Sequence, residues 1–152
     1  MRLAVVALAV TIVGTAACDA PPKQELAVEN AWIRLPAVAG RPGAAYFTIR
    51  NNGEATILEG VASPQIERIE LHDSNMTGGL MRMGPLTDSK IAPGAELVFA
   101  PGGRHAMLFD MAERIIPGGQ VPLHFRFSGG REVKAVASVV SAGDGAPGHD
   151  GH

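Results

Sequence analysis

Residues 121–140 read VPLHFRFSGGREVKAVASVV, and this stretch indicates how most of the chain folds. Apolar residues occupy every second position of its first part, at Val121, Leu123, Phe125 and Phe127. Because successive side chains of a strand leave opposite faces, this alternation predicts a half-buried β-strand. Ser128-Gly129-Gly130 then predicts a turn, and residues 132–140 predict a second strand beside the first.

The same succession of short apolar stretches and turn residues extends back to Leu26. Further candidate strands lie at 26–33, 44–50, 56–61, 66–72, 96–100 and 105–111, and Asn51-Asn52-Gly53 marks a turn after the second of these. No stretch has the apolar spacing of an amphipathic helix. Seven to nine short strands separated by turns predict an all-β fold, an antiparallel β-sandwich or barrel.

Composition limits the classes of function. The 152 residues allow one ordinary domain, and a hydrophobic content of 46% is enough for a packed core. Thirteen Lys and Arg against fifteen Asp and Glu leave no basic footprint for nucleic acid, so we exclude that partner. A single cysteine, Cys18, excludes an intrachain disulfide, a CxxC redox pair and a Cys-rich zinc site.

The N-terminus predicts export from the cytoplasm. Residues 1–17 contain Arg2, an apolar run over 3–13 and then small residues, which is the pattern of a signal peptide. Cys18 follows Thr-Ala-Ala in a lipobox-like context, which predicts lipidation of Cys18 as the first mature residue; cleavage without a lipid is the alternative. We expect a tether at 18–25, one domain at 26–140, a flexible tail at 141–152, and membrane contact only through the lipid.

Methionine is confined to one part of the sequence. Apart from Met1, every methionine lies between residues 72 and 111, a window that also contains two histidines. Its members are His72, Met76, Met81, Met83, His105, Met107 and Met111. Methionines that only fill gaps in a core would be scattered along the chain. His105 and Met107 are two apart, so on a strand both side chains leave the same face and can reach one point.

Imidazole and thioether together indicate which metal such a cluster prefers. Thioether is a soft, neutral ligand that favours Cu(I), whereas zinc sites use thiolate, imidazole and carboxylate, and calcium and magnesium require oxygen. A blue-copper electron-transfer centre needs a cysteine thiolate. Because the only cysteine is at the leader junction, that function is excluded and a Cu(I)-binding site remains.

The spacing of these residues resembles the motif of the PCuAC family of periplasmic copper chaperones. That motif is His, ten residues, Met, twenty-one residues, then His-x-Met, and it is matched by His72, Met83, His105 and Met107. The resemblance covers residues 26–140 and includes the stretches at 31–34, 44–46 and 101–105. Asp73 departs from the pattern, since many members carry Met or Glu directly after the first His.

The resemblance implies a cupredoxin-like β-sandwich or Greek-key barrel that binds Cu(I) through His72, Met83, His105 and Met107. It also implies a periplasmic protein that delivers copper to the dinuclear centre of cytochrome c oxidase, on subunit II, together with Sco-type thiol proteins. We expect such a carrier to be monomeric.

Other residues in and near the window have alternative interpretations. Met76 and Met81 are auxiliary candidate ligands, although core packing is favoured for Met81 and for Met111. His149 and His152 in the tail are candidates for Cu(II). We expect Trp32 in the core or at its rim, and His124 on a solvated face.

Two rival functions remain open, and a third is not expected. The same site would serve copper sequestration without a dedicated acceptor, or the chain would be a metal-free β-sandwich interaction module. An enzyme is not expected, because the sequence shows no nucleophile–base pair, no catalytic metal set with a carboxylate base and no phosphate-binding glycine loop.

Overall fold

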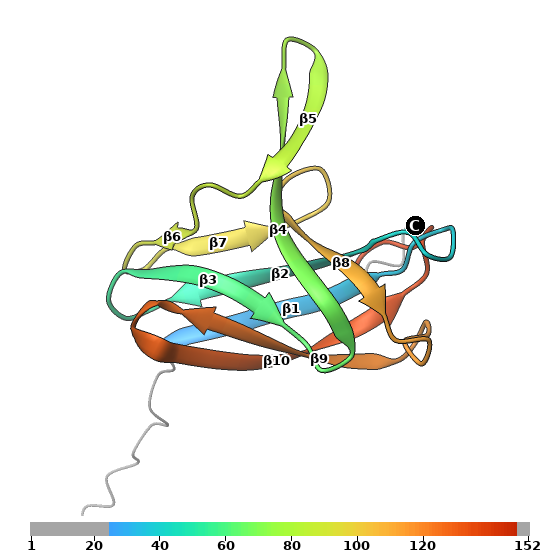
Figure 1. Ribbon diagram of the computed structural model, residues 1–152. Coiled ribbons are helices and arrows are strands. Elements are labelled where there is room, and N and C mark those ends of the chain that lie inside the picture. Colours follow the sequence, from blue (N-terminus) through green and yellow to red (C-terminus); the bar gives the residue numbers. More distant parts are fainter. Residues whose placement is uncertain (1–24, 149–152) are drawn as a thin grey trace, which may run out of the picture.

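The computed structural model describes residues 25–148, and most of them lie in β-strands (Figure 1). The strands are β1 (Leu26–Arg34), β2 (Gly43–Asn51), β3 (Thr56–Ala62), β4 (Ile66–Thr77), β5 (Leu80–Pro85), β6 (Lys90–Ile91), β7 (Glu96–Phe99), β8 (His105–Met111), β9 (Gln120–Phe127) and β10 (Arg131–Val140). A 3-10 turn, η1 (Ser128–Gly130), links β9 to β10 as the glycines predict. Within residues 25–148 no helix has the length and apolar character needed to cross a membrane.

The strands form one sheet in the order β5-β4-β8-β2-β1-β10-β9-β3-β6, with β7 also paired to β2. The sheet folds over on itself around a single core, so the predicted all-β class is confirmed. Its strand pairs are antiparallel with one exception in the described chain: β1 and β10 run parallel, with Trp32 opposite Ser138. The alternation at 121–127 did not indicate that pairing, because period two is the same for parallel and antiparallel strands.

Phenylalanine rings from three strands meet at the centre of the core. Phe47 on β2 stacks on Phe99 of β7 at a centroid distance of 4.3 Å and meets Phe125 of β9 edge to face at 4.8 Å. The four apolar positions quoted above are all buried, at 0–1% exposure. These contacts join distant parts of the sequence and make the body rigid enough to carry a site on its outer face.

Asn51 ends β2 as a buried polar anchor, where the sequence predicted only a turn. Its Nδ2 donates to the carbonyls of Glu54 (2.7 Å) and Ile91 (3.0 Å), and its Oδ1 accepts from the amide of Gly53 (3.1 Å). The turn does not close a hairpin, because β2 and β3 are not neighbours in the sheet. Asn51 instead ties the β2–β3 connection to β6.

Strands β4 and β5 form a hairpin whose outer part projects away from the body (Figure 1). Gly78 and Gly79 have φ angles of 60° and 79°, the left-handed conformations that a two-residue hairpin turn requires. Thr77 therefore lies opposite Leu80, and the ladder continues to His72 opposite Pro85. The sequence predicted a strand that ends at residue 72. The observed strand, β4, continues to Thr77, because β5 supplies its outer half with hydrogen-bonding partners.

The two ends of the chain lie partly outside the described residues. The signal peptide, Cys18, most of the tether, His149 and His152 are all among residues 1–24 and 149–152. Residues 141–148, predicted as part of a flexible tail, contain a turn in which the amide of Ser141 donates to the Asp144 carboxylate at 3.2 Å. Ala146 and Pro147 line a cavity together with Trp32, so this part of the tail lies against the body.

Candidate metal site

Strand register brings the predicted histidines and methionines onto one face of the sheet. His72 on β4 lies directly opposite His105 on β8, and Ser74 lies opposite Met83 on β5. Residues opposite each other, or two apart on a strand, share a face. The other face of β8 carries Ala106 and Leu108, which are completely buried in the core. The candidate site is therefore on the outer face, where the hairpin leaves the body.

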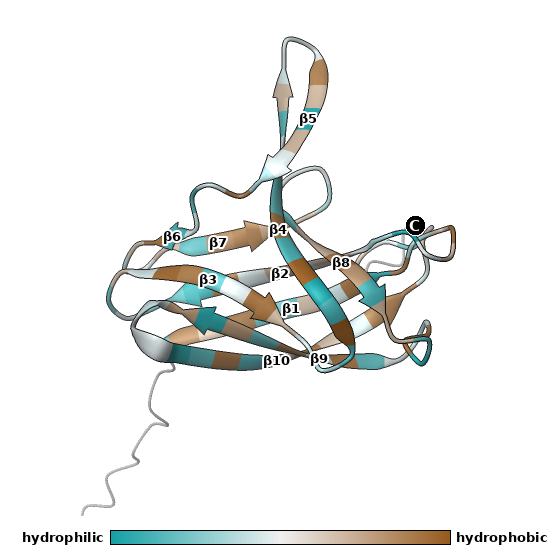
Figure 2. Ribbon diagram, in the orientation of Figure 1, coloured by the Kyte–Doolittle hydropathy of each residue, from teal (hydrophilic) through white to brown (hydrophobic). Residues whose placement is uncertain are grey.

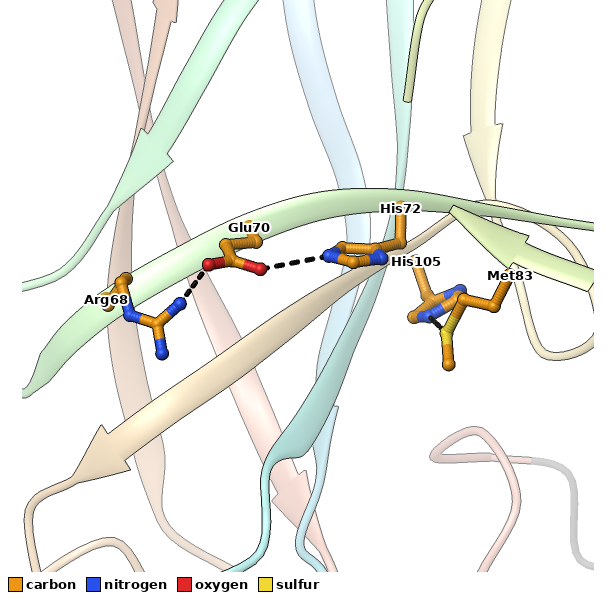
Figure 3. A network of polar contacts seen from close by, with 5 residues as sticks. All are labelled: Arg68, Glu70, His72, Met83 and His105. Atoms are coloured by element: carbon orange, nitrogen blue, oxygen red, sulfur yellow. Dashed lines mark hydrogen bonds and ion pairs between the residues drawn. The ribbon is translucent and has the colours of Figure 1, made fainter. Parts of the chain in front are cut away.

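His105 is held with one ring nitrogen available. Its Nδ1 lies 2.9 Å from the carbonyl oxygen of Gly103, which can only accept, so Nδ1 carries the proton and donates. The lone pair is then on Nε2, which lies 3.1 Å from the sulfur of Met83 (Figure 3). A backbone carbonyl that fixes the tautomer in this way is typical of metal-binding histidines.

His72 is oriented by charged residues of its own strand. Its Nε2 lies 3.0 Å from a carboxylate oxygen of Glu70, whose other oxygen pairs with Arg68 (Figure 3). The hydrogen bond with His72 lowers the pKa of the Glu70 carboxyl, and the Arg68 charge acts in the same direction. A carboxylate accepts the Nε2 proton, so the lone pair of neutral His72 is on Nδ1.

That second nitrogen of His72 has no hydrogen-bond partner among the described residues, although it is buried. It lies on the side of the ring turned toward His105 (Figure 3), and the two imidazole rings are 5.9 Å apart between centroids. A buried polar atom without a partner is costly, and such atoms commonly face a ligand or ion. Nδ1 of His72, Nε2 of His105 and the Met83 sulfur therefore make a set of three neutral, soft-to-intermediate donors.

Met107 lies on the same face, two residues beyond His105. It is opposite Glu70 on β4 and opposite Ala44 on β2, and it is half-buried. The structure thus brings His72, Met83 and His105 into mutual proximity and places Met107 on the adjoining position of that surface.

The donor set favours a soft monovalent cation. Among residues 25–148 there is no group of three or more His, Cys, Asp or Glu side chains that could hold a metal ion. Two imidazoles and two thioethers carry no negative charge. They match the preference of Cu(I) for soft, neutral ligands.

The candidate ligands all lie on strands. His72 lies within β4 and Met83 within β5, while His105 begins β8 and Met107 follows two residues later. The long β4 strand pairs with both β5 and β8 and so aligns these positions. Side chains on strands are held more precisely than side chains on loops.

The remaining methionines have separate outcomes. The preference for Met81 in the core is wrong: its side chain is 58% exposed, because β5 stands clear of the body. Met76, also exposed, lies on β4 and not in a loop. Met111 packs against the core as predicted, close enough to Gly43 that a Cβ there would lie 2.9 Å from its methyl group.

Trp32 and His124 lie apart from the proposed ligands. Trp32 is buried as predicted and packs on Tyr46 at 4.5 Å, and the cation over its ring is Arg34, at 5.9 Å. His124 on β9 is partly exposed and lies 3.3 Å from Glu132. Neither observation gives these residues a part in metal binding.

Two residues of the site escaped the sequence analysis. Glu70 and Arg68 have no motif of their own, and only their spacing could have revealed them. Both stand at even steps from His72 along one strand, hence on the same face. Once the strand is known, a carboxylate two residues before a candidate histidine ligand indicates a residue that can hydrogen-bond to that histidine and orient its ring.

Comparison with solved structures agrees with the predicted cupredoxin-like fold. The copper-bound PCuAC domain of PmoF2 aligns with a TM-score of 0.64 and 21% identity over 78% of this chain and 94% of that domain. The apo PCuAC domain of PmoF1 gives 0.63 and 24% over 78% and 95%. The Cu(I) form of DR1885 from Deinococcus radiodurans gives 0.58 and 24% over 82% and 83%.

No match was found among curated proteins. A family model described as "Putative lipoprotein LpqE-like" matches residues 26–139, which is nearly all of the folded domain. Together with the PCuAC structures, this match confirms the resemblance stated above. The chain belongs to the LpqE-like family.

Proposed function

We propose that this protein is a Cu(I) carrier that works outside the cytoplasm, with His72, Met83, His105 and Met107 as its ligands. The observation that carries the proposal is the approach of Nε2 of His105 to the Met83 sulfur, at 3.1 Å. Because Nδ1 of His105 donates to the Gly103 carbonyl, the lone pair of the neutral ring is on Nε2, and one soft cation can bind both this nitrogen and the sulfur. The unpartnered Nδ1 of His72 on the same face supplies a third donor.

The similar structures support copper as the cargo. The PmoF2 domain is described as copper-bound, and the DR1885 form as a Cu(I) form. In this chain, neutral ligands would hold Cu(I) without burying it, since Met83 is 57% exposed. An incoming ligand can then attack from the solvent side, and the ion passes through a mixed-ligand intermediate to the acceptor. The role is carriage of a metal and not catalysis.

The cellular setting is also part of the proposal. The family's lipoprotein description and the lipobox-like Cys18 support a periplasmic protein anchored through a lipid on that cysteine. The PCuAC resemblance supports delivery to the dinuclear copper centre of cytochrome c oxidase subunit II, with or without a Sco-type partner. We infer a monomer with a short tether at 18–25. His149 and His152 are proposed as an additional Cu(II) site.

Anaerobic titration against a chromophoric Cu(I) chelator tests the site. Two proteins are compared, one with the native site and one with His105→Ala/Met107→Ala. Both also carry His149→Ala and His152→Ala, so that the tail histidines cannot bind copper. We expect one tightly bound Cu(I), lost in the variant. His124→Ala is the matched control, because that histidine lies on β9 away from the site, and it should bind like wild type. Failure of the wild type to compete for Cu(I) would refute the proposal.

Transfer separates the carrier from a sequestering protein. The Cu(I)-loaded chain is mixed with the soluble copper domain of oxidase subunit II, with and without a Sco-type protein, and copper is measured on each after separation. Carriage predicts net transfer. Retention of the ion with every acceptor would favour sequestration.

A further inference from the structure

The β4–β5 hairpin carries methionines that the four-ligand site does not use. Met76 is 69% exposed and Met81 is 58% exposed, beside the proposed ligand Met83 at 57%. None of them belongs to the hydrophobic core. Single exposed apolar side chains are common, but several gathered on one element indicate an interaction or ligand site.

These methionines all occupy one face of the hairpin. Met76 lies directly opposite Met81, and Ser74 lies opposite Met83, so the three thioethers alternate with the pair formed by Asn75 and Arg82. The other face carries Asn75 and Arg82 and, next to the turn, Thr77 and Leu80, while this one is lined with sulfur. In Figure 2, β5 is brown and tan with a single teal band between these colours.

The glycine turn determines that the side chains of Met76 and Met81 lie close together. Thr77 and Leu80, next to the two-residue turn, form a hydrogen-bonded pair, which makes Met76 and Met81 the adjacent non-hydrogen-bonded pair. Side chains approach most closely in pairs of that kind, with Cβ atoms about 4.5–5.5 Å apart. Two flexible thioethers on such a pair can converge on one ion between them.

We propose that Met76 and Met81 form a second Cu(I) site, weaker than the first, at the outer end of the hairpin. Two neutral thioethers with no imidazole suit only a soft monovalent ion. Met81 precedes Met83 by two residues on the same face, about 7 Å along the strand. An ion on the outer pair is thus one two-residue step along β5 from Met83 of the four-ligand site. This inference rests on the proposed Cu(I) function.

The test follows the methionine methyl groups by NMR in the processed full chain, labelled with [¹³C-methyl]methionine, as Cu(I) is added anaerobically. The first equivalent should shift Met83 and Met107. Further Cu(I) should shift Met76 and Met81, while Met111, packed over Gly43, stays unmoved as the internal reference. The signals report each site separately, so tail histidines do not interfere.

Two variants keep the two claims apart. Met76→Leu/Met81→Leu preserves apolar size and should lose only the second, weaker equivalent, leaving the Met83 and Met107 shifts intact. His105→Ala/Met107→Ala should lose the first and keep the Met76 and Met81 response. Unmoved Met76 and Met81 signals in excess Cu(I) would overturn the second site alone and leave the hairpin face as a protein contact. Shifts at Met76 and Met81 without any at Met83 and Met107 would overturn the four-ligand site instead.

Discussion

The body of the molecule and its projecting hairpin use apolar side chains in opposite ways. In the body, Phe47 and Phe125 are almost completely buried and fixed by ring contacts. In the hairpin, Met76 and Met81 are mostly exposed, on strands paired as regularly as those of the body. The body's apolar residues provide stability, whereas those of the hairpin carry the donor atoms that we propose for Cu(I). Substitutions in the two regions should therefore separate stability from copper binding.

Phe125→Ala should have the largest effect. Removing a fully buried ring at the centre of the core costs about 3–5 kcal/mol of unfolding free energy, because the cavity cannot collapse. Urea denaturation followed by intrinsic fluorescence measures this loss. Where the variant remains folded, Cu(I) binding should be close to wild type. An unchanged denaturation midpoint would show that the core tolerates the cavity and would weaken the contrast between regions.

Asn51→Ala should have the next largest effect on the free energy of unfolding. The substitution leaves the carbonyls of Glu54 and Ile91 without their amide donor, at a cost of about 1–3 kcal/mol. The same denaturation measurement applies. Glu54→Ala, which removes an exposed side chain of the same turn but keeps the carbonyl that Asn51 binds, is the comparison variant and should cost less. An equal loss in both would mean that the turn as a whole, and not the buried amide, carries the stabilisation.

Glu70→Ala tests the junction between body and hairpin. Loss of the carboxylate frees the His72 ring, so we expect Cu(I) affinity to fall about 10–100-fold with little change in stability. Chelator competition measures the affinity, and thermal unfolding checks the fold. Glu70→Gln keeps an oxygen that can accept the Nε2 proton and should recover part of the affinity. Equal affinities in all three proteins would remove Glu70 from the site.

Met76→Leu/Met81→Leu should have the smallest effect on stability. Both side chains lie in solvent, so the unfolding free energy should stay within about 0.5 kcal/mol of wild type. Denaturation of the copper-free protein is the measurement. A loss comparable to that of Asn51→Ala would show that these methionines pack, and the contrast between the two regions would then fail.

The sequence by itself determined the strand class and the identity of the four proposed ligands. Period-two alternation at 121–127 depends only on local backbone geometry, and the spacing from His72 to Met107 is a property of the chain. Local patterns also located most strand boundaries to within a residue or two. The extension of β4 to Thr77 was missed because its outer half is polar on one face and exposed on both.

Tertiary structure alone decided where those residues meet and what surrounds them. Register between β4 and β8 set His72 opposite His105, and register with β5 brought Met83 to within 3.1 Å of His105. Neither pairing follows from local sequence, because strands adjacent in the sheet are chosen by the packing of the whole core. The same packing gave His72 its carboxylate and left Met76 and Met81 in solvent. Position in the fold, and not residue type, separates Met111, which packs against the core, from Met83, which is exposed and a proposed ligand.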